Sequence, residues 1–145
     1  MTKIKMRPVQ RSFCDNYLQK SEELFDTAKW SFENKKWNAC AIISIHTVIS
    51  ASDALCVYFL GFRASGNRHE DAAELLKSIP VEKESLRTNL RRFGKILNIK
   101  NEAEYEERLI REGEAQTMLN DTKRFFEFAK NKLSEIDGAD YLLKN

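Results

Sequence analysis

Residues 37–60 read WNACAIISIHTVISASDALCVYFL, and this stretch decides the fold class. Its apolar residues cover most of the circumference of a helix, which is typical of the central member of a helical bundle. Gly61 follows directly, at the position where a glycine commonly ends a helix. The stretch is about as long as a membrane span, but it contains His46 and Asp53, and a carboxylate near the centre of a bilayer is costly. We therefore expect a buried central helix and no association with a membrane.

Helical spacing continues on both sides of this stretch, because apolar residues recur every three to four positions almost throughout the chain. No segment shows the period of two that marks a strand. The sequence therefore predicts an all-α fold, an up-and-down bundle of four to five helices. In chain order we expect a helix over 8–34, the central helix to residue 60, a loop over 62–68, helices over 68–79 and 81–97, a connector over 98–101 and a last helix from 102 or later to 136.

Residues that cap or break helices set several of these boundaries. Asn67 can cap the helix that follows it, Pro80 ends that helix, and Gly138 is expected to close the last one. The predicted inward residues are Val9, Phe13, Tyr17, Leu24, Phe25, Ala28 and Phe32 in the first helix, Ala72, Leu75, Leu76 and Ile79 in the third, Leu86, Leu90, Phe93 and Leu97 in the fourth, and Ala115, Met118, Leu119, Thr122, Phe125, Phe126, Ala129 and Leu133 in the last.

Length and composition indicate one domain over residues 1–145. Five glycines and two prolines are too few for a turn-rich all-β fold. Cys14, Cys40 and Cys56 lack the short spacing of a zinc site, so we expect no metal and no cofactor. Unpaired cysteines within helices indicate a reducing, cytoplasmic location, and the N-terminus has no apolar run of the kind that makes a signal peptide.

The charge is unevenly distributed, although the formal net charge is only +2. Residues 1–20 and 83–100 are basic, and residues 102–114 are acidic. Within the second basic segment, Lys83, Arg87, Arg91 and Lys95 recur every four residues along the predicted fourth helix. We call these four residues the basic ladder. It can follow a nucleic-acid backbone, but an ordinary solvated helix face explains it equally well, and the acidic segment is a possible partner for it in the fold or across a dimer.

His46, Ser50 and Asp53 share one face of the central helix. They are the residue types of a hydrolase triad, but side chains that project in parallel from one helix have no aligned nucleophile and no oxyanion hole. We interpret them as a hydrogen-bonded polar seam inside the bundle, or at a dimer interface. A hydrolase built on these residues ranks well below that interpretation.

Arg63 and His69 flank the predicted loop that precedes a helix. An arginine can bind a phosphate through two parallel hydrogen bonds, and a histidine can transfer a proton near neutral pH. Together they suit phosphodiester cleavage without a metal, with Arg68 as a further phosphate contact. The spacing alone favours a simpler interpretation, in which Arg63 is a solvated loop residue and His69 packs on its own helix.

Three segments resemble the HEPN (higher eukaryotes and prokaryotes nucleotide-binding) family. Residues 37–55, WNACAIISIHTVISASDAL, are similar to the family's central helix, which reads A-x-H-x-x-I-x-x-x-D-A-L. Residues 61–76, GFRASGNRHEDAAELL, resemble its pattern G-x-R-x-x-x-x-x-H-x-x-A-x-x-L-L. Ala103 to Tyr105, Ala115 and Phe125 resemble its later A-x-Y, A and F positions, so that the resemblance covers about residues 25–133.

The resemblance implies a helical bundle of four or five helices that commonly forms a homodimer. Several HEPN branches are metal-independent ribonucleases with four to six residues between an arginine and a histidine, and Arg63 and His69 have five residues between them. In these branches two such motifs meet at the dimer interface and cleave RNA by attack of the 2′-hydroxyl. They occur as toxins paired with antitoxin proteins and in defence against phage. Other members are inactive and serve as binding or assembly modules.

The leading hypothesis is a HEPN-like module that acts on RNA or a nucleotide, with Arg63 and His69 as candidate catalytic residues of a ribonuclease of the toxin–antitoxin or defence type. The alternative is a non-catalytic interaction domain that holds a partner protein or a nucleotide through the same loop.

Overall fold

The computed structural model describes residues 3–66 and 69–144, and their side chains except those of His69, Asn101 and residues 136–144. Asn67, predicted to cap a helix, lies outside the described residues. The chain forms an all-α helical bundle with one very short sheet, which confirms the predicted fold class. Its elements are β1 (Met6–Pro8), the 3-10 helix η1 (Arg11–Phe13), α1 (Cys14–Glu33), α2 (Trp37–Leu60), β2 (Phe62–Ala64), α3 (His69–Leu76), α4 (Lys83–Asn98), α5 (Lys100–Tyr105) and α6 (Glu112–Lys144).

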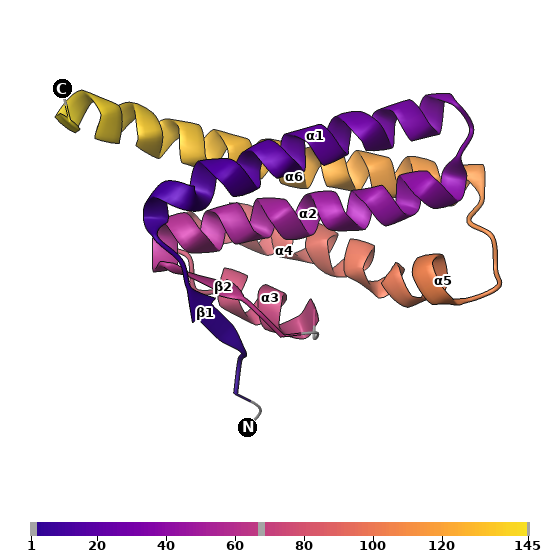
Figure 1. Cartoon of the computed structure of the whole chain (residues 1–145), viewed down its shortest axis with the longest axis horizontal. Coiled ribbons are helices and arrows are strands. Elements are labelled where there is room, and N and C mark those ends of the chain that lie inside the picture. The colour runs from indigo at the N-terminus through magenta and orange to yellow at the C-terminus, as the bar shows by residue number, and fades with distance from the viewer. Residues whose placement is uncertain (1–2, 67–68, 145) are drawn as a thin grey trace.

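Helix α2 forms the centre of the bundle, with α1, α4 and α6 around it (Figure 1). Most of its side chains from Cys40 to Tyr58 are buried, as its apolar sequence predicts. Gly61 ends it with φ 75° and donates its N–H to the Val57 carbonyl oxygen at 3.0 Å, which a residue with a side chain would do only under strain. By length and composition α2 is able to cross a membrane, but 72% of its most apolar window is buried inside the bundle.

Two predictions for the N-terminal segment were wrong, because residues 6–8 form a strand and the described residues 3–10 contain no helix. Strand β1 pairs antiparallel with β2, with Arg7 opposite Arg63, and Val9 N–H donates to the Gly61 carbonyl oxygen at 3.0 Å. The expected absence of strands was wrong since three-residue strands are too short to show a period of two. The ribbon lies under the C-terminal end of α2 and beside α3 (Figure 1).

Several later boundaries also differ from prediction, including the end of α3, which comes at Leu76 and not at residue 79. The expected connector over 98–101 contains the start of α5, because Ile99 keeps a helical conformation and accepts a hydrogen bond from Ala103 N–H at 2.9 Å. Helix α6 starts at Glu112, within the predicted range, but it continues through Gly138, which was expected to close it, since one glycine inside a helix costs only about 1 kcal/mol. Helix α4 begins after Glu82, whose carboxylate accepts the N–H groups of Glu84 and Ser85 at 2.9 and 2.7 Å.

The core follows the predicted inward faces of α3, α4 and α6, and Phe93 and Phe125 pack at its centre with ring centroids 5.1 Å apart. Phe13 is the exception, since its side chain is 47% exposed. It belongs to η1, whose orientation follows the β1–β2 ribbon, so the spacing of the α1 residues no longer applies to it.

Candidate functional site

The predicted polar stripe of α2 changes from exposed to buried along the helix. His46 has a 52% exposed side chain and lies 3.4 Å from a carboxylate oxygen of Glu104 on the neighbouring α5, so it is at the surface and not inside the bundle. Ser50 is half-buried and Asp53 is buried. Among the described residues no hydrogen bond joins the three side chains, and they form no continuous seam. Only Asp53 belongs to a cluster of charged groups.

Arg63 on β2 is the partner of Asp53. Its Nε lies 3.5 Å from Asp53 Oδ2, and the side chains are 29% and 8% exposed. The guanidinium also stands over the ring of Tyr17 on α1, 5.4 Å from the ring centroid. Arg63 is therefore held between two helices, whereas the simpler interpretation of the sequence made it a solvated loop residue. Nε is buried without a hydrogen-bond partner among the described groups.

Two more cations surround this pair. Arg7 faces Arg63 across the β1–β2 ladder, so both side chains leave the same face of the ribbon. Lys20, one helical turn after Tyr17 on α1, places its Nζ 5.7 Å from the centre of the Tyr17 ring. Like charges directly opposite each other destabilise a sheet, so the two arginines need an anion nearby. We call Arg7, Lys20 and Arg63, with Asp53 and Tyr17, the cationic cluster.

Two opposing effects, burial and the attraction of nearby cations, set the pKa of Asp53 in the cationic cluster. Burial raises the pKa of the Asp53 carboxyl to about 6, and the charges of Arg63, Arg7 and Lys20 lower it by less. Removal from water thus outweighs the attraction of three cations. Even when it is fully ionised, one carboxyl does not neutralise three cations, so the five residues of the cationic cluster carry an excess of positive charge.

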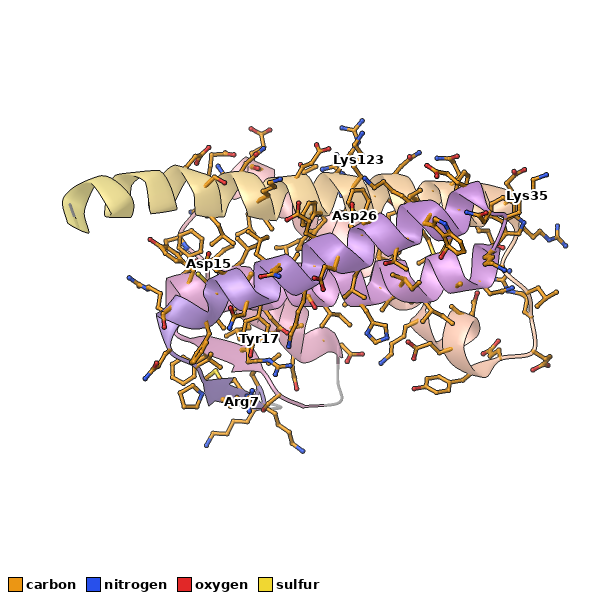
Figure 2. The ribbon with its side chains drawn as sticks, turned by 45° about the horizontal axis from the view of Figure 1, so that its top comes forward. Arg7, Asp15, Tyr17, Asp26, Lys35 and Lys123 are labelled. Carbon is orange, nitrogen blue, oxygen red and sulfur yellow. The ribbon has the colours of Figure 1, made fainter. Side chains whose placement is uncertain are left out.

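Part of the cationic cluster borders a depression of about 470 Å³ at the ribbon end, and neither Arg63 nor Asp53 is among the residues that line it. Arg7 and Lys20 line it together with Asn16, Gln10, Phe13 and Tyr17. Figure 2 shows Arg7 and Tyr17 on this side of the bundle, with Lys123 on the far side. Guanidinium and ammonium donors beside an open hollow and an aromatic ring suit an anionic group such as a phosphate.

The loop between β2 and α3 packs against the N-terminal segment. Ser65 N–H donates to the Lys5 carbonyl oxygen at 2.9 Å, and a Cβ atom added to Gly66 would lie 3.0 Å from Lys5 Cβ and 3.2 Å from Asp71 Oδ2. His69 is the first residue of α3, but its side chain and the whole of Arg68 lie outside the described residues. The approach of His69 to Arg63 therefore stays a prediction.

The basic ladder is exposed along α4, and its residues Lys83, Arg87 and Arg91 point to solvent. Lys95 pairs with Asp121 on α6 at 3.3 Å. In residues 3–66 and 69–144 no ion pair links the basic ladder to the acidic segment 102–114, whose glutamates bind Arg108 and His46 instead.

The three cysteines are buried, and no disulfide joins them in the part of the chain that the structure describes. Burial, with the nearby Asp53, raises the pKa of the Cys56 thiol to about 12, and burial also raises the pKa of Cys40. Thiols of this kind are poor nucleophiles. The described residues hold no group of three or more His, Cys, Asp or Glu side chains arranged to bind a metal.

Sequence reasoning named Arg63 and Asp53 but assigned them to different sites, and it missed Arg7, Tyr17 and Lys20. The available signal was the basic excess of residues 1–20. A comparison of the sequence with protein-family models and with curated proteins finds no match in either.

Proposed function

We propose that this protein is a HEPN-like module that binds RNA or a nucleotide through phosphate groups at the cationic cluster. The observation that carries the proposal is the convergence of Arg7, Lys20 and Arg63 on one buried carboxylate beside an open depression. Cations on this scale supply most of the sequence-independent affinity for a nucleic-acid backbone. The similarity of residues 37–55 to the HEPN central helix supports the family assignment, and so does the position of that helix in the centre of the bundle.

We further propose Arg63 and His69 as the catalytic pair of a metal-independent ribonuclease of the toxin–antitoxin or defence type. In this mechanism His69 exchanges a proton with the 2′-hydroxyl or the leaving oxygen, and Arg63 stabilises the charge that develops on the phosphate. One histidine cannot easily act on both sides of an in-line displacement. A homodimer that brings two such pairs to one phosphate supplies the second acid–base group, and an antitoxin-like protein is the expected cellular partner.

The alternative function is a non-catalytic interaction domain, and one observation favours it. The ion pair with Asp53 and the contact with Tyr17 give Arg63 a structural role, in which it fastens the ribbon to α1 and α2. An arginine used in this way need not contact a substrate.

Binding of a fluorescent single-stranded RNA, followed by anisotropy, tests the phosphate site. We expect the double variant Arg7→Gln/Lys20→Gln to bind at least about tenfold more weakly, with a salt dependence shallower by about two phosphate contacts. Lys35→Gln/Lys123→Gln is the matched control, because both lysines are exposed and lie away from the depression (Figure 2). Equal loss in both double variants, or in neither, would contradict the site.

Cleavage of RNA in the presence of a metal chelator separates the two functions. The ribonuclease proposal predicts cleavage that His69→Ala abolishes without weakening RNA binding. RNA binding without cleavage by the unchanged protein favours the interaction domain. Light scattering tests the homodimer, and the mass of a single chain at working concentration counts against it.

A further inference from the structure

The groove between α4 and α6 contains two depressions that follow each other along the helices. One, of about 460 Å³, lies between the end of α4 and the start of α6. The other, of about 260 Å³, lies between the start of α4 and the middle of α6. The two helices are antiparallel, since residues 95–99 face 113–121 and residues 85–92 face 124–135. Together the depressions span residues 85–99, from α4 to the residue that follows it, a length of about 20 Å at helical rise.

The surface of the first depression is mostly apolar and includes a glycine, although the charged residues Lys95, Glu114 and Asp121 also line it. Ile96, Ile99 and Met118 contribute apolar atoms to its walls. Gly113 lines it without a side chain, and a Cβ atom added there would meet nothing within 4 Å. The space beside Gly113 can therefore take an apolar side chain that the chain itself does not supply.

The second depression presents oriented arginines. Asn89 is buried, its Nδ2 donates to the Ser85 carbonyl oxygen at 2.8 Å, and its Oδ1 accepts from Arg92 Nη1 at 3.1 Å. The amide thus fixes the direction of the Arg92 guanidinium, which retains further N–H donors. Arg124 lines the same depression from α6.

The carboxylates of this depression are already paired, while the arginines are not. Glu135 lies 3.8 Å from Lys132, and Glu127 lies 4.0 Å from Lys123. Neither Arg92 nor Arg124 has an ion pair with a carboxylate in the described part of the chain. The basic ladder adds positive charge along the same helix. This end of the groove therefore favours carboxylates, which bind arginine through two parallel hydrogen bonds.

We infer that this groove is a docking surface for an amphipathic, acidic segment of a partner protein. The segment places apolar side chains beside Gly113 and carboxylates on Arg92 and Arg124. About 15 residues of helix match the length of the groove, with anchors at the spacing of one helical face. Single-stranded RNA fits less well, because bases bind by stacking on exposed rings, and no aromatic residue lines the apolar depression.

A displayed library of random peptides of about 15 residues, selected on the whole protein, tests the inference. We expect selection of peptides that combine apolar residues at helical spacing with an acidic end. A labelled copy of the strongest one then serves as the probe in anisotropy measurements. No enrichment, or enrichment of basic or uncharged peptides, would overturn the inference.

Two variants locate the probe in the groove. Gly113→Leu fills the apolar depression and Arg92→Glu/Arg124→Glu reverses the charge of the other, and we expect each to weaken binding at least about tenfold. The matched controls are Gly94→Leu on α4, where an added Cβ also meets no atom within 4 Å, and Lys29→Glu/Lys36→Glu on exposed positions elsewhere. Both controls should bind within about twofold of the unchanged protein. Circular dichroism verifies that all variants are folded.

The outcome is independent of the proposed function at the cationic cluster. Arg7→Gln/Lys20→Gln should bind the peptide as tightly as the unchanged protein does, whether or not that variant still binds RNA. A peptide insensitive to both groove variants would overturn the inference. So would labelled RNA that loses affinity in Arg92→Glu/Arg124→Glu and keeps it in Gly113→Leu, since the groove would then be a nucleic-acid surface.

Discussion

Two arginines in this chain each hold a connecting segment through ion pairs, and their surroundings are opposite. Arg63 has a 29% exposed side chain and faces one carboxylate, Asp53, that is 8% exposed. Arg108 is 41% exposed and binds two carboxylates, those of Glu102 and Glu114, between α5 and α6. The partners of Arg108 are each six residues away in sequence, whereas Arg63 reaches back across the end of α2 and rests on Tyr17 of α1.

The comparison shows that the number of ion pairs an arginine makes need not match its contribution to the stability of the fold. Hydrogen bonds with Glu114 and Glu102 raise the pKa of Arg108, and Arg108 lowers that of Glu114, so each partner favours the charged form of the other. Water nevertheless solvates all three groups, so it can replace each of their hydrogen bonds when a partner is removed. The pKa of Asp53 moves in the unfavourable direction, to about 6, because burial outweighs Arg63. We therefore expect loss of the Arg63–Asp53 pair to matter more for stability, since little water can reach the Asp53 carboxylate.

The largest effect is expected for Arg63→Met. Asp53 then remains buried without its nearest cation, and we expect the free energy of unfolding to fall by about 2–4 kcal/mol at about pH 8. At about pH 5 the loss should be smaller, because the carboxyl is already protonated there. Urea denaturation at both pH values measures it. An equal loss at both would show that Arg63 acts through packing and not through Asp53.

The pH dependence of stability should change next most, through Asp53→Asn. The folded pKa of about 6 exceeds that of an unfolded aspartate, about 3.9, so the native state holds a proton that the unfolded state releases between these values. This contribution is fully present below about pH 4 and is lost as the pH rises through about 6. Relative to Asp53→Asn, the unchanged protein should lose about 1–3 kcal/mol between pH 4 and 7. Parallel stability curves for the two proteins would refute the raised pKa.

These two regions also show what the sequence could and could not predict. The apolar surface of α2 and the helical spacing elsewhere identify the bundle, because burial of whole helix faces repeats over many residues. Asp53 was visible as a polar residue in an apolar helix, and Arg63 as part of a motif. Their pairing was not visible, since it depends on the turn at Gly61 that brings β2 back beneath α2.

The remaining members of the cationic cluster depend on contacts that leave no periodic trace. Arg7 reaches the site only because β1 pairs with β2, and each of these strands has three residues. Tyr17 packs half-buried against the core, as predicted, and its ring also forms the surface over which Arg63 and Lys20 stand. Helix propensity and residue spacing describe one helix or strand at a time, whereas this site is formed where four elements meet, namely β1, β2, α1 and α2.

A smaller effect is expected for the aromatic support of Arg63. Tyr17→Leu removes the ring under the guanidinium, and we expect a loss of about 0.5–1 kcal/mol in the free energy of unfolding. Tyr17→Phe keeps the ring and should retain most of the stability. If Tyr17→Phe loses as much as Tyr17→Leu, the hydroxyl is responsible and the ring is not.

The smallest effect is expected for Arg108→Met, although Arg108 makes more ion-pair contacts than Arg63. The segment that contains it is also held by Ile110, which is buried and whose N–H donates to Asn38 Oδ1 at 2.8 Å. That anchor remains when Arg108 is replaced, and water solvates the released glutamates. The midpoint of urea denaturation should therefore stay within experimental error of the unchanged protein, at low and at high salt. A clear drop at low salt that disappears at high salt would mean that the exposed pairs stabilise the fold by themselves. The contrast with Arg63 would then rest on the number of contacts, and burial would no longer explain it.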